Sequence, residues 1–581
     1  LFSYTDTSFS GGQLRAVIGD GMTILDGSQK DLDFELLADA STEDAFGLGV
    51  AVFEGRLAVG AKNADGSIEK SGSTGDKING SGEVHLFTFN DDVGAFDGVT
   101  HQATIGQNFS GTISLRGYSD NTELQTETGV TGKNIDLCNT CIEWVGGTDS
   151  YSTNPTGDSL AEGAISVRGG DQFGRSVALS ADSDGNTVLA AGSWKGDGED
   201  NDKSASGEVL LFTFNDGASG KDFDNGVLAA MVGDGYDNDY SGNNPRSGRD
   251  VHVDLDGSDV FGTGVALDYD SSLQVHRLAV AARMDDGAEN DDIRNGAVRL
   301  FTFTDDSFGG GQHVATLGAD YAPELTVADA SNALTAGRVI TGGTSGATGV
   351  VVVGDASSTS VTYTLTTGNF VDGETITEAT SSFTRTVSEV LNDYTSFLPG
   401  ETITEATSGF TRTIGSTNGS VKENIILNES DETQSIVSIA LDGNYLAVGS
   451  YINDGFAGDC ASCGAAYLYS FNTNTVTSSF RGLTLEGTIG DGYTGAQDVH
   501  VLPETGDEIT NDVTLQNSDG FGKDISLDNN RLVVGATQGR GQGDVNGAAS
   551  NARYGEVHIF PIQHYEETDA VFATNPSTDI T

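Results

Sequence analysis

The sequence predicts an all-β protein, a β-propeller of about five four-stranded blades with a small all-β module inserted; six or seven blades are the alternatives. Three observations lead to this prediction. One pattern of alternating apolar and polar residues recurs five times along the 581 residues. Four of the five recurrences contain four strand-length segments, and helical periodicity is almost absent. Four antiparallel strands per repeat are typical of propeller blades rather than of helical solenoids.

Each repeat begins with a predicted β-hairpin. Its first strand is an alternating run such as VALS or DISL, and its second is an aliphatic run such as LAVG or LVVG. Between them, turns of the Asp-Gly-Asn or Asp-Asn-Asn kind supply the positive φ angles that tight hairpins need. The five hairpins begin at Phe46, Phe173, Phe261, Ser435 and Phe521.

A third strand follows in every repeat, and a fourth strand follows in the first four repeats. The third strand follows a loop rich in Gly, Asp and Asn and reads GEVHLFTFND, GEVLLFTFND, GAVRLFTFTD, GAAYLYSFNT or GEVHIFPIQH. The fourth follows closely as HQATIG, VLAAMVG, HVATLG or LTLEGTIG. Short apolar runs bounded by turn residues are the pattern of antiparallel strands.

The spacing of the hairpins locates two insertions. The hairpin starts are 127, 88, 174 and 86 residues apart, so one repeat is about 87 residues long. The first insertion lies around residues 110–160 and contains CNTC. The second is rich in Thr, Ser and Gly and repeats GETITEAT, which predicts a small all-β module. We therefore expect blades in 1–321, the inserted module in 322–423 and further blades in 424–581.

Phe-Gly, a strand, an Asp-Gly-Asn turn, LAVGA, a polar loop and GEVHLF together resemble the FG-GAP repeat of integrin-alpha-type propellers, which is also common in secreted bacterial proteins. The resemblance covers all five repeats and is specific for fold, not for function. The Thr-rich module resembles, more distantly, the β modules of phage and other surface fibres. The FG-GAP resemblance implies calcium binding by alternating aspartates in hairpin loops.

Three acidic clusters are candidate calcium sites. Alternating carboxylates can surround a hard cation, and a nearby glycine permits the sharp turn that such loops need. An ordinary solvated acidic loop is the alternative for each cluster. The candidate ligands are Asp182, Asp184 and Asn186; Asp254, Asp256 and Asp259; and Asp234, Asp237 and Asp239.

The two ends of the sequence predict an assembly strand. LFSYTDTSFSGGQLRAVIGDG aligns with the segment that begins LFTFTDDSFGGGQHVATLG at Leu300, so the sequence starts within a third strand. Residues 1–5 and 558–562 both match the third strand, so the two ends of the sequence overlap instead of completing one blade. Three explanations of this overlap stay open: a frayed end, a piece of a longer array, or a strand that pairs with a neighbouring molecule as a head-to-tail polymer. The residues expected at such a junction are Gln13, Leu14, Val17, Ile18, Val557 and Ile559.

Four cysteines form two close pairs, Cys138 with Cys141 and Cys460 with Cys463. We expect two local disulfides; a shared zinc ion and redox or crosslinking roles are the alternatives. No HExxH motif, Walker loop or nucleophile elbow is present in the sequence, so no catalytic residues are predicted. His85 and His558 occupy equivalent third-strand positions, which favours packing over catalysis.

The formal net charge of −58 excludes anionic partners that this chain would have to bind through basic patches of its own, and makes cations the natural partners. It repels phosphate backbones and anionic lipids, so we expect no nucleic-acid binding, and no apolar run reaches the roughly 20 residues of a spanning helix. The first residues lack the pattern of a signal peptide, and a start at Leu1 leads us to expect a processed chain or a fragment.

These observations favour a non-enzymatic, secreted or cell-surface scaffold for adhesion or assembly. Its expected partners are further copies of itself, or surface proteins and glycans, and calcium is the one expected cofactor. Two other functions stay open: a carbohydrate-binding or hydrolytic propeller, which requires aromatic and carboxylate residues on one face, and a viral fibre or spike component.

Overall fold

The computed structural model describes about half of the 581 residues. They are 1–3, 13–19, 32–33, 44–64, 80–90, 97–106, 133–137, 170–199, 202–216, 223–236, 246, 248–287, 294–318, 324–326, 338–342, 348–353, 360–367, 375–378, 384–386, 402–405, 411–413, 425–426, 436–455, 460–472, 480–493, 500–501, 515–528, 531–539 and 555–563.

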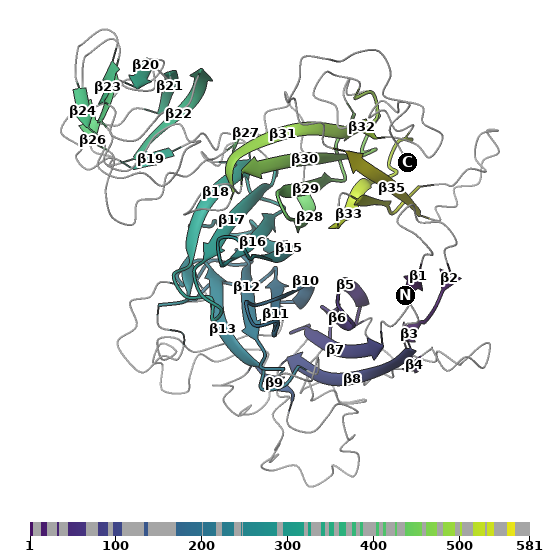
Figure 1. Cartoon of the computed structure of the whole chain (residues 1–581). Helices are drawn as coiled ribbons and strands as arrows, with labels where there is room; N and C mark the ends of the chain where they lie inside the picture. The colour runs from purple at the N-terminus through teal and green to yellow at the C-terminus, as the bar shows by residue number, and fades with distance from the viewer. Residues whose placement is uncertain are drawn as a thin grey trace. The chain divides into compact units, whose positions relative to one another are not determined.

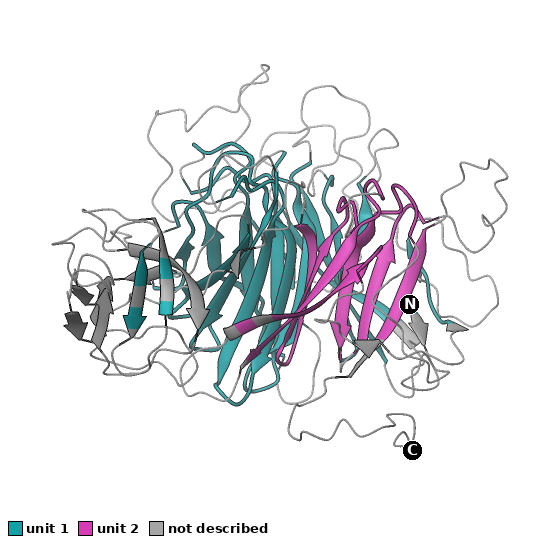
Figure 2. Cartoon of the chain, turned by 90° about the horizontal axis from the view of Figure 1, so that it is seen from above, with its two compact units in different colours: residues 1–428, 472–481 teal, residues 429–471, 482–581 magenta. Residues whose placement is uncertain are grey.

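The described residues form β-strands and no helix, and the strands build five propeller blades, which confirms the predicted fold class (Figure 1). No helix in this part of the chain is therefore long and apolar enough to cross a membrane. The chain divides into two compact units, 1–428 with 472–481 and 429–471 with 482–581 (Figure 2).

The first unit contains three consecutive blades, each an antiparallel sheet in sequence order. Blade 1 consists of β5 (Phe46–Phe53), β6 (Arg56–Ala61), β7 (Glu83–Asn90) and β8 (Asp97–Gly106). Blade 2 consists of β10 (Phe173–Ala181), β11 (Thr187–Ser193), β12 (Glu208–Thr213) and β13 (Val227–Gly233). Blade 3 consists of β15 (Phe261–Asp270), β16 (Val275–Ala282), β17 (Ala297–Phe303) and β18 (Gln312–Gly318).

The second unit contains the last two blades. Blade 4 consists of β28 (Ile436–Asp442), β29 (Tyr445–Ser450), β30 (Ala465–Asn472) and β31 (Arg481–Gly490), where residues 472–481 are grouped with the first unit. Blade 5 consists of β33 (Phe521–Asp528), β34 (Arg531–Ala536) and β35 (Glu556–Gln563), and β32 (His500–Val501) pairs with β35 at its edge.

A short fifth strand, which the sequence analysis missed, follows the fourth strand of each of the first three blades. It runs parallel to that strand, unlike the antiparallel pairs within the blade. In blade 2 its sequence signal is the brief apolar segment DVHV after the fourth strand. These strands are β9 (Ile135–Asp136), β14 (Val251–His252) and β27 (Ile425–Ile426).

The N-terminal segment repeats the outer half of a blade. β1 (Phe2–Ser3) pairs antiparallel with β2 (Gln13–Leu14), and β3 (Ile18–Gly19) pairs parallel with β4 (Leu32–Asp33). This order of an antiparallel and then a parallel pair matches the third, fourth and fifth strands of blades 1 to 3. The alignment of the N-terminus with the segment from Leu300 therefore corresponds to a real structural equivalence.

The Thr-rich insertion forms one eight-stranded sheet. The two copies of GETITEAT give two hairpins with the same register, because Thr375 pairs with Thr386 as Thr402 pairs with Thr413. The strands are β19 (Glu324–Thr326), β20 (Val339–Gly342), β21 (Thr348–Val353), β22 (Ser360–Thr367), β23 (Thr375–Glu378), β24 (Thr384–Thr386), β25 (Thr402–Glu405) and β26 (Thr411–Thr413).

The Phe-Gly pair makes a β-bulge at the start of a blade and joins that blade to the preceding one. In blade 2 the pairing register shifts between Phe173 and Ser176, and the Phe173 ring packs edge-on against Phe212, with ring centroids 6.2 Å apart. The Phe173 amide donates to the Ser81 carbonyl of blade 1 at 2.9 Å. The same bond recurs at Phe261 and Phe521, at 2.8 Å each. The sequence signature is therefore a junction between blades as well as a hairpin start.

Glycines allow adjacent blades to approach closely at these junctions. A Cβ on Gly60 of β6 would lie 1.8 Å from the Gly174 carbonyl oxygen of blade 2. Gly192 and Gly449 have the same relation to the following blade, at 2.1 Å each. Such distances are far below any real carbon contact, so only glycine fits the LAVG strand at these positions.

Blade 4 departs from this pattern. It begins at Ile436 without a Phe-Gly pair, and its register shift spans fewer residues than in the other blades. The preceding blade has Ala281 where blades 1, 2 and 4 have the close-packed glycine. The division of the chain into two units follows blade 3, where the junction signature is absent.

Candidate functional site

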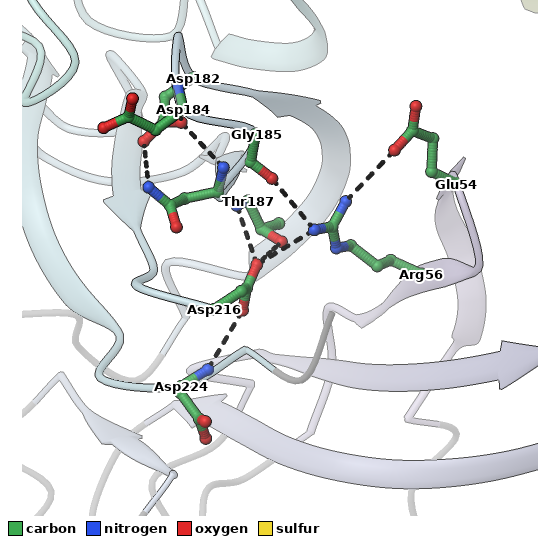
Figure 3. Close-up of polar contacts among 9 residues, drawn as sticks. Glu54, Arg56, Asp182, Asp184, Gly185, Thr187, Asp216 and Asp224 are labelled. Atoms are coloured by element: carbon green, nitrogen blue, oxygen red, sulfur yellow. Dashed lines mark hydrogen bonds and ion pairs between the residues drawn. The ribbon is translucent and has the colours of Figure 1, made fainter. Parts of the chain in front are cut away.

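The first calcium candidate closes the hairpin of blade 2. Asp182 Oδ1 accepts the backbone N–H groups of Asp184 and Asn186 at 2.9 and 2.8 Å, and Oδ2 accepts Asn186 Nδ2 at 2.9 Å (Figure 3). These bonds are those of an Asx turn, which stabilises the positive-φ Gly185. The neighbouring Ser183 donates to Asp306 of blade 3, so the turn also contacts the next blade.

Beside this turn lies a buried ion pair that the sequence analysis missed. Arg56 of β6 in blade 1 donates to Asp216 Oδ2 at 3.2 Å and to the Gly185 carbonyl at 3.3 Å in blade 2 (Figure 3). Asp216 also accepts the amide and hydroxyl of Thr187 and the amide of Asp224. Arg56 is 1% exposed, so this charge is neutralised within the fold. Its signal is an arginine before the LAVG strand, which repeats at Arg277 and Arg531.

One lysine, Lys203, contacts an aspartate from each of the other two calcium candidates. Lys203 Nζ lies 2.9 Å from Asp234 Oδ1 and 3.6 Å from Asp254 Oδ1, and it donates to the Leu255 carbonyl at 2.6 Å. The hydrogen bond to Asp234 and the nearby carboxylates raise the pKa of Lys203, although burial opposes the shift. A protein ammonium group therefore lies between two aspartate clusters that the sequence analysis treated separately. Asp237 and Asp239 lie outside the described residues.

Asp259 is a buried carboxyl group with an unusual pKa. It accepts the Asp256 amide at 2.8 Å, and Asp285, which pairs with Arg299 at 2.7 Å, lies nearby. Burial first, and then the charge of Asp285, raise the pKa of Asp259 to about 7. The group is therefore largely protonated below neutral pH.

We expect Asp259→Asn to stabilise the protein increasingly as the pH rises. Between about pH 4 and pH 7 the unfolded chain loses this proton while the folded chain retains it, so the parent loses stability as pH rises. The difference in unfolding free energy between variant and parent should grow by about 2 kcal/mol from pH 5 to pH 8. Urea denaturation at both pH values measures it. Asp184→Asn, in the exposed hairpin turn, is the control, and an equal change in both variants contradicts the assignment.

The cysteine pair of blade 4 differs from the expectation. Cys460 and Cys463 are two buried thiols in the structure and not the disulfide that the sequence led us to expect. Their sulfurs hydrogen-bond to backbone carbonyls, Cys460 to Leu515 at 3.8 Å and Cys463 to Asn453 at 3.7 Å. Asp491 lies beside them. Cys138 and Cys141 lie outside the described residues, so their pairing stays a prediction.

Among the described residues, the predicted calcium ligands do not form a group of three converging carboxylates. Within the described residues, the group of three potential ligands that converge is Cys460, Cys463 and Asp491. Calcium binding at the acidic loops stays a prediction.

The described buried histidines lie among aromatic rings. His85 lies between Phe46 and His101, with ring centroids 5.7 Å away in each case, and burial lowers its pKa to about 3. His276 packs against Tyr269 and Phe308 at 5.0 and 4.8 Å, and burial lowers its pKa to about 4. A neutral ring in an aromatic cluster contributes packing area, in agreement with the strand-face role expected for His85.

The expected assembly residues lie in two places. Gln13 and Leu14 belong to β2, Ile18 belongs to β3, and Val17 lies between these strands. Val557 and Ile559 belong to β35, the third strand of blade 5. Leu14, Val557 and Ile559 are all exposed apolar side chains, 59%, 66% and 37% respectively.

Comparison with known proteins finds no match in sequence and only distant likenesses among solved structures. No family model matches the sequence, and no curated protein matches it. An aldose sugar dehydrogenase from Streptomyces coelicolor, solved with PQQ bound, is 8% identical, with 89% of this chain and 93% of that chain covered and a TM-score of 0.25. Saccharomyces cerevisiae Sqt1 is 11% identical, with 86% and 82% covered and a TM-score of 0.22. The polysaccharide lyase Uly1 is 10% identical, with 94% and 96% covered and a TM-score of 0.22. Likenesses this distant carry no argument about activity.

Proposed function

We propose that this chain is a non-enzymatic, extracellular or cell-surface propeller scaffold of FG-GAP-like repeats that assembles with copies of itself. The support is how the fold uses its repeated residues. The Phe-Gly pairs and close-packed glycines join blades, and Arg56 with Asp216 links two of them. In this proposal the function depends on blade faces that no neighbouring blade covers.

One uncovered surface belongs to blade 5 and carries the proposal. Val557 and Ile559 are 66% and 37% exposed, whereas the residues at the same two positions of the other four blades are buried. Those buried residues are Val84 and Leu86, Val209 and Leu211, Val298 and Leu300, and Ala466 and Leu468. In blades 1, 2 and 4 the first strand of the following blade packs over at least one of the pair. Blade 5 thus has the face that normally receives a following blade.

The complementary surface belongs to blade 1. Val50 and Val52 of β5 are 54% and 50% exposed, although their counterparts in blades 2, 3 and 4 are buried. Val177 and Leu179 of blade 2, for example, pack on Val84 and Leu86 of blade 1. Blade 1 thus has the face that normally covers a preceding blade.

The occupant of the blade 5 face is, in this proposal, blade 1 of a second copy. The two faces match the junction that already joins neighbouring blades, and burying them removes exposed valine and isoleucine from water, at about 25 cal/mol per Å². A contact between two different faces of identical chains is heterologous and propagates head to tail unless it closes into a ring. The N-terminal strands β1 to β4, which correspond to the outer half of a blade, would lie at the same junction.

The charge sets the conditions for this assembly. Chains with a net charge of −58 repel one another, so association should need salt or divalent cations, of which calcium at the acidic loops is the expected one. Adhesion to a surface protein or glycan would use the same multivalent array, because linked copies bind a surface more tightly than single ones.

Sedimentation velocity of the full chain across concentration, with calcium chloride or with a chelator in matched sodium chloride, tests the proposal. We expect species larger than the 60.1 kDa monomer that grow with concentration, and linear assemblies by electron microscopy. Val557→Asp and Val50→Asp should each return the chain to a monomer. A chelator that dissolves the assemblies would support calcium as the linking cation.

Val227→Asp is the matched control, because Val227 is 53% exposed at the start of β13 and belongs to neither face. It should leave the assembly unchanged. A chain that is monomeric at every concentration and ionic condition contradicts the proposal, as does an assembly that Val557→Asp and Val50→Asp do not alter. Circular dichroism of each variant checks that the strands remain folded.

A further inference from the structure

The two thiols of blade 4 correspond in sequence to a lysine and a serine of blade 2. The loop between the second and third strands reads GDGEDNDKSASGEV in blade 2 and NDGFAGDCASCGAA in blade 4. Aligned on the glycine before the third strand, Cys460 corresponds to Lys203 and Cys463 to Ser206. After the fourth strand, GDGY occurs in both blades, so Asp491 corresponds to Asp234.

In blade 2 this position holds a cation. The Lys203 ammonium lies 2.9 Å from Asp234, and the Tyr236 hydroxyl of the same GDGY segment donates to Glu208. The lysine joins the second-to-third-strand loop to the turn after the fourth strand. Its positive charge compensates the aspartate at a place where both segments turn.

In blade 4 the lysine is gone and two sulfur ligands take its place. One ligand atom each from Cys460, Cys463 and Asp491 lie within 4.8 Å of one another. Cys463 is fully buried, Cys460 is almost so, and Asp491 is half-buried. Near these ligands, Asn453 Oδ1 accepts a hydrogen bond from the Tyr493 hydroxyl at 3.2 Å, and Asn453 Nδ2 donates to the Tyr467 hydroxyl at 3.1 Å. Blade 4 thus has an aspartate in the same position as blade 2, but it has metal-binding thiols where blade 2 has the lysine and a serine.

We propose that Cys460, Cys463 and Asp491 bind a divalent metal ion of the zinc class, which takes the place that the lysine ammonium has in blade 2. Two thiolates and one carboxylate suit a borderline-soft ion, whereas calcium prefers oxygen ligands only. Three protein ligands leave the fourth position of a tetrahedral ion for water or another ligand.

Metal binding at this site should depend on pH, because a ligating sulfur must lose its proton. A bound metal ion replaces the protons of both thiols, and the two protons leave to solvent as two metal–sulfur bonds form. Metal affinity should therefore rise with pH by up to about 100-fold per unit below the thiol pKa values.

The bound ion would strengthen the junction between blades 4 and 5. The Cys463 carbonyl accepts the Phe521 amide at 2.8 Å, and Cys460 Sγ hydrogen-bonds to the Leu515 carbonyl. Both contacts connect the proposed metal loop to the first strand of blade 5 and the turn before it. Metal binding should therefore raise the unfolding midpoint, by an amount that grows with the logarithm of the metal concentration divided by its Kd.

Titration of the fully reduced full chain with cobalt(II), followed by competition with zinc, tests the site. We expect one equivalent of cobalt to give a thiolate-to-metal charge-transfer band that zinc removes. The double variant Cys460→Ser/Cys463→Ser should lose the band. Asp491→Asn should weaken affinity about 10-fold or more, since even residues outside the ligand shell have effects of this size.

Two control variants test whether the charge-transfer band depends specifically on the proposed ligands. Cys138→Ser/Cys141→Ser removes the other thiol pair, and Asp234→Asn removes the equivalent carboxylate of blade 2; neither should change the band. Reduced chain that shows no charge-transfer band overturns the proposal, as does a band that survives in Cys460→Ser/Cys463→Ser. A Cys460–Cys463 disulfide that persists in strong reductant, seen by mass spectrometry, would also overturn it.

Discussion

Replacing Gly60 by alanine should lower the free energy of unfolding by about 3 kcal/mol or more, among the largest single-residue effects expected in this chain. The new methyl group would lie 1.8 Å from the Gly174 carbonyl oxygen, and backbone atoms of two packed sheets cannot move aside without separating the blades. Gly60 has no positive φ, so the effect comes from the contact alone. Urea denaturation followed by circular dichroism measures it.

Gly535→Ala is the matched control for this prediction. Gly535 has the same place in the second strand of blade 5, but the nearest atom to an added Cβ is 3.5 Å away, an ordinary contact. We expect a change within about 0.5 kcal/mol. Blade 3 already has Ala281 at this position. Equal destabilisation by the two substitutions would refute the role of the close approach between blades.

Replacing Arg56 by methionine should cost about 3–5 kcal/mol, because it leaves the Asp216 carboxylate buried without its cation. Thr187 and the Asp224 amide still donate to that carboxylate, but neither carries a compensating charge. Because the pair is buried, added salt should leave the difference nearly unchanged. Unfolding free energies in low and high salt measure both effects.

Arg531→Met tests whether burial is the cause. Arg531 precedes the same strand in blade 5 and is only partly buried. We expect a loss of about 1 kcal/mol or less, as for exposed ion pairs. A loss at Arg531 as large as that at Arg56 would contradict the assignment. The double variant Arg56→Met/Asp216→Asn should recover part of the stability lost in Arg56→Met, because it removes the unpaired charge.

The fold could be predicted in detail because the same strand pattern recurs in five repeats. Four of the five hairpins begin at the expected phenylalanines, at β5, β10, β15 and β33. Alternation with period two assigns each strand a buried face, and a turn residue ends each strand, so local sequence suffices. The short parallel strands such as β14 were missed because two residues are too few for periodicity to register.

The site contacts could not be predicted because they join residues far apart in the sequence. Arg56 and Asp216 are 160 residues apart, and Lys203 contacts carboxylates of two acidic loops at once. Among 86 acidic residues, spacing alone does not indicate which carboxylate meets which base. The internal repeat offers one remedy, since aligning blade 2 with blade 4 relates Lys203 to Cys460.

Amide hydrogen exchange of the full chain tests the central claim, that the repeated Phe-Gly pairs join the blades and leave other surfaces for assembly. The Phe173, Phe261 and Phe521 amides each donate to the preceding blade. We predict that these amides exchange as slowly as the amides of the central strands β6, β11 and β34, because they are exposed to solvent only when a whole blade unfolds. Exchange as fast as that of the exposed hairpin turns would contradict the claim.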